Sequence, residues 1–151
     1  MSLIAEPDTV NFPEAHYVFM EREGNIPTIA PQTWQSVGAL GREIEKHNRI
    51  VGAAALYKTK PGVYRAGFIL AEAPVDLPKD LRYAKLPSEK FVRFTLTGPY
   101  DQLPEATRRA FEIVAEKKIP LRDDFNIEHY LKDSMTTPAD ELVTEIMFPV
   151  K

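Results

Sequence analysis

The chain carries the same order of secondary-structure signals twice, and this repeat limits its fold more than any other feature. In the first half, Tyr17–Glu23 has the aromatic and β-branched composition of a strand. Apolar residues then recur every three to four positions, which predicts a helix over Thr33–His47. Two apolar, strand-like runs follow at residues 50–58 and 62–74, joined by the turn sequence TKPG. The first half therefore predicts the order β-α-β-β.

The second half repeats this order after a connector, residues 74–87, that is punctuated by prolines. Its predicted strand, helix, strand and closing strand lie at Glu89–Gly98, Leu103–Lys117, Asn126–Asp133 and Glu141–Lys151. Gly24 recurs as Gly98 and Tyr57 as Tyr130, offsets of 74 and 73 residues. A nearly constant offset of this kind indicates an internal duplication.

The duplication favours an α+β fold built from two β-α-β-β modules, residues 17–73 and 88–151. We expect the modules to be related by a pseudo-two-fold axis within one domain of residues 1–151, with an antiparallel sheet and two main helices. The seam between such modules is a natural place for a central groove that holds a ligand.

Composition excludes several classes of function. The chain has 151 residues, a net charge of −3 and no cysteine. Without a basic stripe it is not expected to bind nucleic acid directly, and without cysteine it has no disulfide, thiol nucleophile or Cys-based metal site. No apolar run is long enough to span a membrane and no signal peptide is visible, so we expect a soluble, cytoplasmic protein. No phosphate loop, dinucleotide fingerprint or zinc motif occurs, and we expect neither cofactor nor metal.

Two acidic residues sit in strand-like surroundings. In NIEHYLKD, Glu128 and Tyr130 point to one face of the predicted strand, where the carboxylate could serve the phenol as a hydrogen-bond partner. Glu128 as an exposed acid on an edge strand is an equally good interpretation of the pattern. Glu145 shares its face with apolar Val143 and Met147. A partly buried carboxylate needs a proton, a hydrogen bond or a cation, and a cationic ligand could supply the cation.

Aromatic residues are numerous on the predicted strands. Core packing is the simpler explanation for Phe19, Phe91 and Phe111. Tyrosine and tryptophan also carry polar atoms that need partners when they are buried. The candidate ligand-binding residues are Glu128, Tyr130, Tyr57, Trp34, Phe68, Tyr100, Glu145 and Phe148. We expect the first five of these to border one cavity between the modules.

Several of these residues fall in segments that resemble the GyrI-like domain, also called the bacterial transcription-activator effector-binding domain. The segments are Trp34 in the first helix, TGPYDQLPEA at 97–106, IEHYLKD at 127–133 and TEIMFPV at 144–150. The resemblance extends from about Tyr17 to the end of the chain and is stronger in the second half. The sequence departs from the family pattern at Thr97, where histidine is frequent. It departs again in IVAEKK, which lacks an aromatic residue near the end of the second helix.

The resemblance implies a duplicated β-α-β-β fold with a ligand groove between the halves. Family members that bind cationic aromatic drugs use a central glutamate, which corresponds to Glu128 through the glutamate-x-tyrosine motif. The implied function is a stand-alone small-molecule-binding protein with a hydrophobic, cationic ligand. Because few residues precede Tyr17, no helix-turn-helix is expected before the domain.

Two other functions stay open. Some GyrI-like proteins hydrolyse reactive, cyclopropane-bearing natural products, and Glu128 would then act as the catalytic residue, directing water. A further alternative is a gyrase-inhibitor type of interaction module with an unidentified protein partner. A haem-binding role, suggested by a distantly similar fold, lacks an obvious axial ligand.

Overall fold

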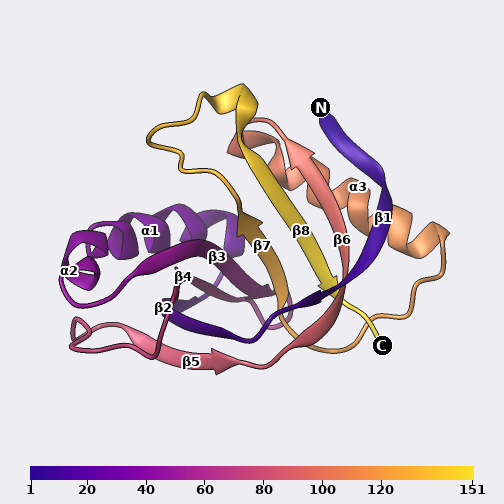
Figure 1. Cartoon of the computed structure of the whole chain (residues 1–151). Helices are drawn as coiled ribbons and strands as arrows, with labels where there is room; N and C mark the ends of the chain where they lie inside the picture. The colour runs from indigo at the N-terminus through magenta and orange to yellow at the C-terminus, as the bar shows by residue number, and fades with distance from the viewer. The chain divides into compact units, whose positions relative to one another are not determined.

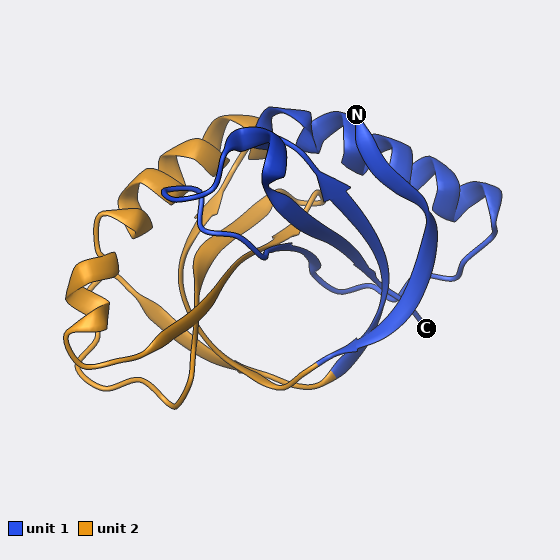
Figure 2. Ribbon diagram, turned by 45° about the horizontal axis from the view of Figure 1, so that its top comes forward, with its two compact units in different colours: residues 1–12, 89–151 blue, residues 13–88 orange.

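The computed structural model describes all residues, 1–151, and divides into two compact units. Unit 1 is formed by Met1–Phe12 together with Glu89–Lys151, and unit 2 by Pro13–Ser88 (Figure 2). Unit 2 is thus one continuous stretch of chain, whereas unit 1 is assembled from two stretches that flank it in sequence. The helices are too short or too polar for any of them to cross a membrane.

Unit 2 is a four-stranded antiparallel sheet with helices on one face (Figure 1). Its elements in chain order are β2 (Ala15–Glu23), α1 (Ile26–Gly38), α2 (Gly41–Glu45), β3 (Ile50–Lys58), β4 (Val63–Leu70) and β5 (Arg82–Leu86). The strands lie in the order β3-β4-β2-β5. Val18, Leu70 and Ile44 of α2 form one buried cluster between the sheet and the helices.

Unit 1 has the same plan. Its elements are β1 (Ser2–Phe12), β6 (Glu89–Thr97), the 3-10 turn η1 (Tyr100–Gln102), α3 (Leu103–Glu116), β7 (Asn126–Tyr130), the 3-10 turn η2 (Ala139–Glu141) and β8 (Val143–Pro149). The strands lie in the order β1-β6-β8-β7 and are antiparallel. Helix α3 packs through Ala106, Ala110 and Ile113 on a core supplied by β6 and β8.

The strands of the two units share one topology, which confirms the predicted duplication. Strands β3, β4 and β2 of unit 2 occur in the same order as β7, β8 and β6 of unit 1. In each unit one further strand pairs with the first strand of the repeat, β5 with β2 and β1 with β6. Trp34 and Phe111 lie on the equivalent helices α1 and α3.

The sequence analysis missed both of these outer strands. β1 was assigned no element, and β5 was placed in a connector. Each pairs along only one edge within its own unit, so their side chains are mostly exposed or half-buried. Exposed strands lack the run of apolar residues by which a pattern identifies a buried strand.

The first helix also differs from its prediction. It begins at Ile26 rather than Thr33, because the Asn25 side chain accepts a hydrogen bond from the Thr28 amide and so caps the first turn. Pro27 is tolerated in that turn, where its missing N–H has no helical partner. The helix ends at Gly38, and a short second helix, α2, covers part of the remaining predicted span. Leu103–Lys117 is helical as predicted, with α3 ending at Glu116.

Candidate functional site

Glu128 and Tyr130 stand side by side on β7, on the face of the unit 1 sheet that α3 covers. Their partners across the β7–β8 ladder are Ile146 and Thr144, and Ile146 belongs to the core beneath α3. The Tyr130 hydroxyl donates a hydrogen bond of 2.7 Å to Oε1 of Glu128. The strand alternation therefore brings together the acid and the phenol that the sequence predicted as partners.

Glu128 is half-buried, and its carboxyl group is partly shielded from water. Burial raises its pKa from the usual value near 4.5, and the hydrogen bond from Tyr130 acts in the opposite direction with a smaller effect. No lysine, arginine or histidine forms an ion pair with this carboxylate, and the Tyr130 hydroxyl is its hydrogen-bond donor. Glu128 is thus an acid in apolar surroundings without a cation from the protein.

Tyr100 adds a second phenol to this group. It is placed by η1, which follows Gly98, whose φ of +145° few other residues adopt. Its ring meets the Tyr130 ring edge to face, with centroids 5.3 Å apart and planes at 62°. Burial and the nearby charge of Asp133 raise the pKa of Tyr100. Glu128, Tyr130 and Tyr100, named here the acid–tyrosine group, form the part of the candidate site that lies in unit 1.

Phe148 has a packing role. Its side chain is fully buried in the core beneath α3, where its ring stacks on Phe111 at a centroid distance of 4.0 Å. Helix α3 and the sheet enclose it. The structure therefore places this predicted ligand-binding residue in the core.

Glu145 lies on the opposite face of the same sheet, paired across the ladder with His129. Its carboxylate accepts a hydrogen bond of 3.0 Å from Nη1 of Arg93 and lies 2.8 Å from Nδ1 of His129. Arg93 also binds Asp8 of β1 through its guanidinium group. The cation that the sequence analysis sought in a ligand is supplied here by Arg93. We name this row of four side chains, Asp8, Arg93, Glu145 and His129, the charged row.

The remaining predicted residues gather in unit 2. Trp34 of α1 donates a hydrogen bond of 2.7 Å from Nε1 to the Tyr64 hydroxyl, and its ring meets Phe68 edge to face at 6.3 Å. Tyr57 of β3 is the cross-strand partner of Tyr64. Tyr64 was not among the predicted site residues. Its position four residues before Phe68 on the same strand, hence on the same face, is the signal that could have identified it.

The protein shows no group of three or more histidine, aspartate or glutamate side chains arranged to hold a metal ion. Apart from Glu145 and Phe148, the candidate site residues form two groups. These are the acid–tyrosine group in unit 1 and the aromatic group of Trp34, Tyr57, Tyr64 and Phe68 in unit 2.

Comparison with known proteins identifies the same family that the sequence motifs suggested. Residues 5–151 match the family described as the GyrI-like small molecule binding domain. No curated protein sequence matches the chain significantly.

Several solved structures share the fold. The C-terminal domain of EcmrR superposes with a TM-score of 0.79 at 18% identity, covering 97% of both chains. EcmrR in its complex with DNA matches with a TM-score of 0.77 at 18% identity, and there the match covers 97% of this chain but 57% of the EcmrR chain. SAV2435 bound to tetraphenylphosphonium matches with a TM-score of 0.68 at 14% identity, over 97% of this chain and 94% of the other.

Proposed function

Because the chain belongs to the GyrI-like family of small-molecule-binding domains, we propose that it binds a hydrophobic, cationic aromatic molecule with Glu128 as the central acid. Tyr130 orients the carboxylate, and Tyr100 and Tyr130 present aromatic surface beside it. Trp34, Tyr57 and Phe68, which the sequence analysis also predicted to bind a ligand, lie in unit 2.

The observation that carries this proposal is a partly desolvated carboxylate with no cationic partner. Glu128 accepts one hydrogen bond from a neutral phenol, and burial outweighs that bond in its effect on the pKa. Elsewhere in the protein, the half-buried acids Glu21 and Glu145 are paired with arginine. A positive ligand would give Glu128 the counter-charge that the chain does not provide.

The neighbouring tyrosines favour the same ligand class. A cation over an aromatic face is attracted by about 0.5–2 kcal/mol, and flat aromatic groups of a ligand would pack on the same rings. The bound state of SAV2435 holds tetraphenylphosphonium, a large hydrophobic cation, on a similar fold. That molecule is therefore a suitable first probe for this chain.

The test is calorimetric titration with three probes of similar size: tetraphenylphosphonium, the anion tetraphenylborate and neutral triphenylphosphine oxide. We expect the cation to bind best. Glu128→Gln keeps the shape of the side chain and removes its charge, so it should weaken cation binding about 10- to 100-fold and leave the neutral probe almost unaffected. Glu112→Gln, on the exposed side of α3, is the matched control for the change in net charge.

Two results would contradict the proposal. Equal losses for the cationic and neutral probes in Glu128→Gln would mean that this residue shapes the site without selecting charge. Unchanged binding of every probe would place the ligand elsewhere.

A hydrolase remains a second candidate, favoured by the raised pKa of Glu128, since a general base is most effective when its pKa approaches the working pH. Incubation with a cyclopropane-bearing electrophile and mass spectrometry of the products separates the two functions. Turnover that Glu128→Gln abolishes supports the enzyme; an unchanged compound supports binding alone.

A further inference from the structure

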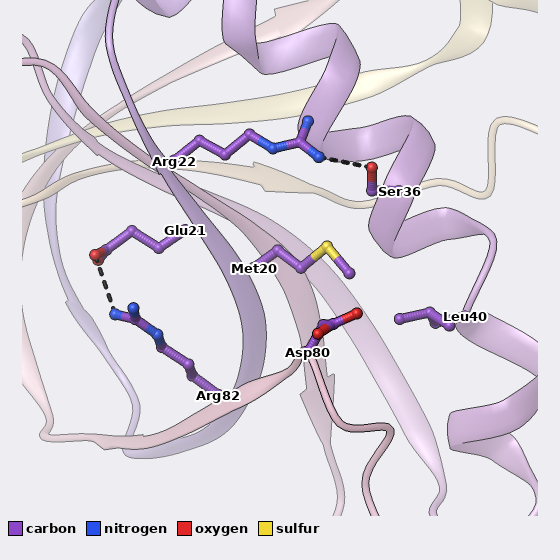
Figure 3. A pocket seen from close by; sticks show the side chains of 7 residues that line it. All are labelled: Met20, Glu21, Arg22, Ser36, Leu40, Asp80 and Arg82. Carbon is purple, nitrogen blue, oxygen red and sulfur yellow. Dashed lines mark hydrogen bonds and ion pairs between the residues drawn. The ribbon is translucent and has the colours of Figure 1, made fainter.

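A cavity lies wholly within unit 2 and shares no residue with either group described above. Its volume is about 460 Å³, and Figure 3 shows the side chains that surround it. The lining residues are Met20, Glu21, Arg22, Ser36, Leu40, Asp80 and Arg82. Its size is in the lower part of the usual range for small-molecule sites.

The cavity exists because β5 covers only part of β2. The pairing between these strands ends where Phe19 meets Arg82, so Met20 and Arg22 have no strand beside them on that edge. Both point to the side of the sheet that α1 covers, since their cross-strand partners are Ala66 and Tyr64. The other walls are formed by Ser36 of α1, by Leu40 between α1 and α2, and by Asp80 just before β5.

Arg22 is the one cation of the cavity without an acidic partner. Its Nη2 donates a hydrogen bond of 2.8 Å to the neutral hydroxyl of Ser36. The other arginine, Arg82, is paired with Glu21, which also pairs with Arg65. Glu21 is thus already neutralised by two arginines. The guanidinium of Arg22 keeps donors that suit a carboxylate, in a half-buried position.

Asp80 supplies the opposite charge. Asp80 is exposed, and its side chain takes part in no hydrogen bond or ion pair within the protein. The backbone holds it at the cavity, because the Leu81 amide donates to the Pro78 carbonyl and the Leu81 side chain packs on the adjoining core. Arg22 and Asp80 do not pair with each other, and Figure 3 shows Met20 between them with Leu40 on the facing wall. Two opposite charges that do not pair with each other therefore flank the apolar side chains of Met20 and Leu40.

We propose that this cavity binds a small zwitterion with an aliphatic side chain, that is, a free amino acid of the leucine type. Its carboxylate would accept hydrogen bonds from Arg22 and from the Ser36 hydroxyl. Its ammonium group would meet Asp80, and its side chain would pack on Met20 and Leu40. The thioether of Met20 adapts readily to aliphatic groups of different shape. The site is independent of the proposed cation site at Glu128.

The test is titration of the full chain with leucine and with two analogues that each lack one charge, 4-methylpentanoate and isopentylamine. We expect leucine to bind at concentrations up to about 10 mM and each analogue to bind at least about tenfold more weakly. Arg22→Gln and Asp80→Asn should each weaken leucine binding about tenfold or more. Arg108→Gln and Asp140→Asn, both in exposed positions of unit 1, are the matched controls and should leave leucine binding unchanged.

Tetraphenylphosphonium binding provides the internal control. Arg22→Gln and Asp80→Asn should leave it unchanged, which also shows that these variants are folded. The proposal is overturned if leucine fails to bind the parent protein at the highest concentration, or if leucine and its two analogues bind equally well. It is also overturned if both cavity variants bind leucine as the parent does. If tetraphenylphosphonium does not bind, the leucine titrations still test the cavity, and circular dichroism then shows whether the two variants are folded.

Discussion

At the scale of single residues, the surroundings of Glu128 determine how its charge depends on pH. Burial raises its pKa in the folded protein above the unfolded value near 4.5, and the Tyr130 hydrogen bond reduces that shift without cancelling it. The native state then binds a proton more tightly than the unfolded chain does. The contribution of this residue to stability is therefore fully present below the unfolded pKa and is lost as the pH rises through the folded pKa.

Cation binding should show the reverse dependence on pH. As the pH falls through the raised pKa of Glu128, the carboxylate takes up a proton and loses its attraction for tetraphenylphosphonium. The affinity should decline with a midpoint above 4.5, in calorimetric titrations over a series of pH values. Glu128→Gln should give a flat profile at low affinity. If the affinity of that variant fell with the same midpoint, the titrating group would be a residue other than Glu128.

The sequence predicted the hydrogen-bond partner of Glu128 but not the partners of Glu145. Glu128 and Tyr130 are two positions apart on a strand, so their shared face follows from alternation alone, and their hydrogen bond is confirmed. The partners of Glu145 come from β6 and β7, and only the register of the sheet brings Arg93 to it. Register across distant strands is not encoded in a local pattern.

At the scale of elements, the charged row ties four strands together on the face of the unit 1 sheet opposite α3. Asp8, Arg93, Glu145 and His129 come from β1, β6, β8 and β7 in spatial order. Arg93 stands at the centre, and its hydrogen bond with Asp8 is the largest influence that lowers the pKa of Asp8. The edge strand β1 is thus attached by side chains as well as by its ladder to β6.

Removing the charge of Arg93 should lower the free energy of unfolding more than removing the charge of Asp8. Arg93→Met leaves the half-buried Glu145 with His129 as its remaining partner, and should lower the free energy of unfolding by about 1–3 kcal/mol. Asp8→Asn removes a mostly exposed charge and should cost about 1 kcal/mol or less. Urea denaturation followed by circular dichroism measures both. A larger loss for Asp8→Asn would show that the exposed end of the row anchors β1.

Elements with strong internal patterns were predicted well, and those without them were not. The run at residues 50–58 coincides with β3, and Leu103–Lys117 differs from α3 by one residue. β1 and β5 each form a strand by pairing with one neighbour. Their own composition does not predict that pairing. The start of α1 was missed because the helix prediction rested on apolar periodicity, to which Asn25 and Pro27 do not contribute. In the structure they are a helix cap and a first-turn proline.

At the scale of the whole molecule, the repeat accounts for the topology of both units, and the outer strands depart from simple duplication. β5 follows its repeat in sequence, whereas β1 precedes its own repeat by the full length of unit 2. The sequence offset predicted the two modules. It did not predict that the first twelve residues belong to unit 1. They belong there because β1 pairs with β6, and a sequence offset contains no information on that pairing.

Deletion of residues 2–12 should therefore affect the two units unequally. Loss of β1 exposes the edge of β6, and β6 amides that bond to β1 should lose protection against hydrogen exchange. Amides of β4, which lies between β3 and β2, should keep theirs. The measurement is exchange monitored by mass spectrometry of peptides from both strands. Equal loss of protection in β4 would mean that the units unfold as one.

The split composition of unit 1 has a consequence for the protein during its synthesis. β1 leaves the ribosome first, yet its partner β6 begins at Glu89, after all of unit 2 has been translated. At about 5–20 residues per second, the nascent strand waits roughly 4–15 s with its backbone unpaired. During that interval β1 could pair with strands of other nascent chains. Its acids Glu6 and Asp8 disfavour such pairing by their charge, and the proline between them disfavours it because it has no N–H to donate.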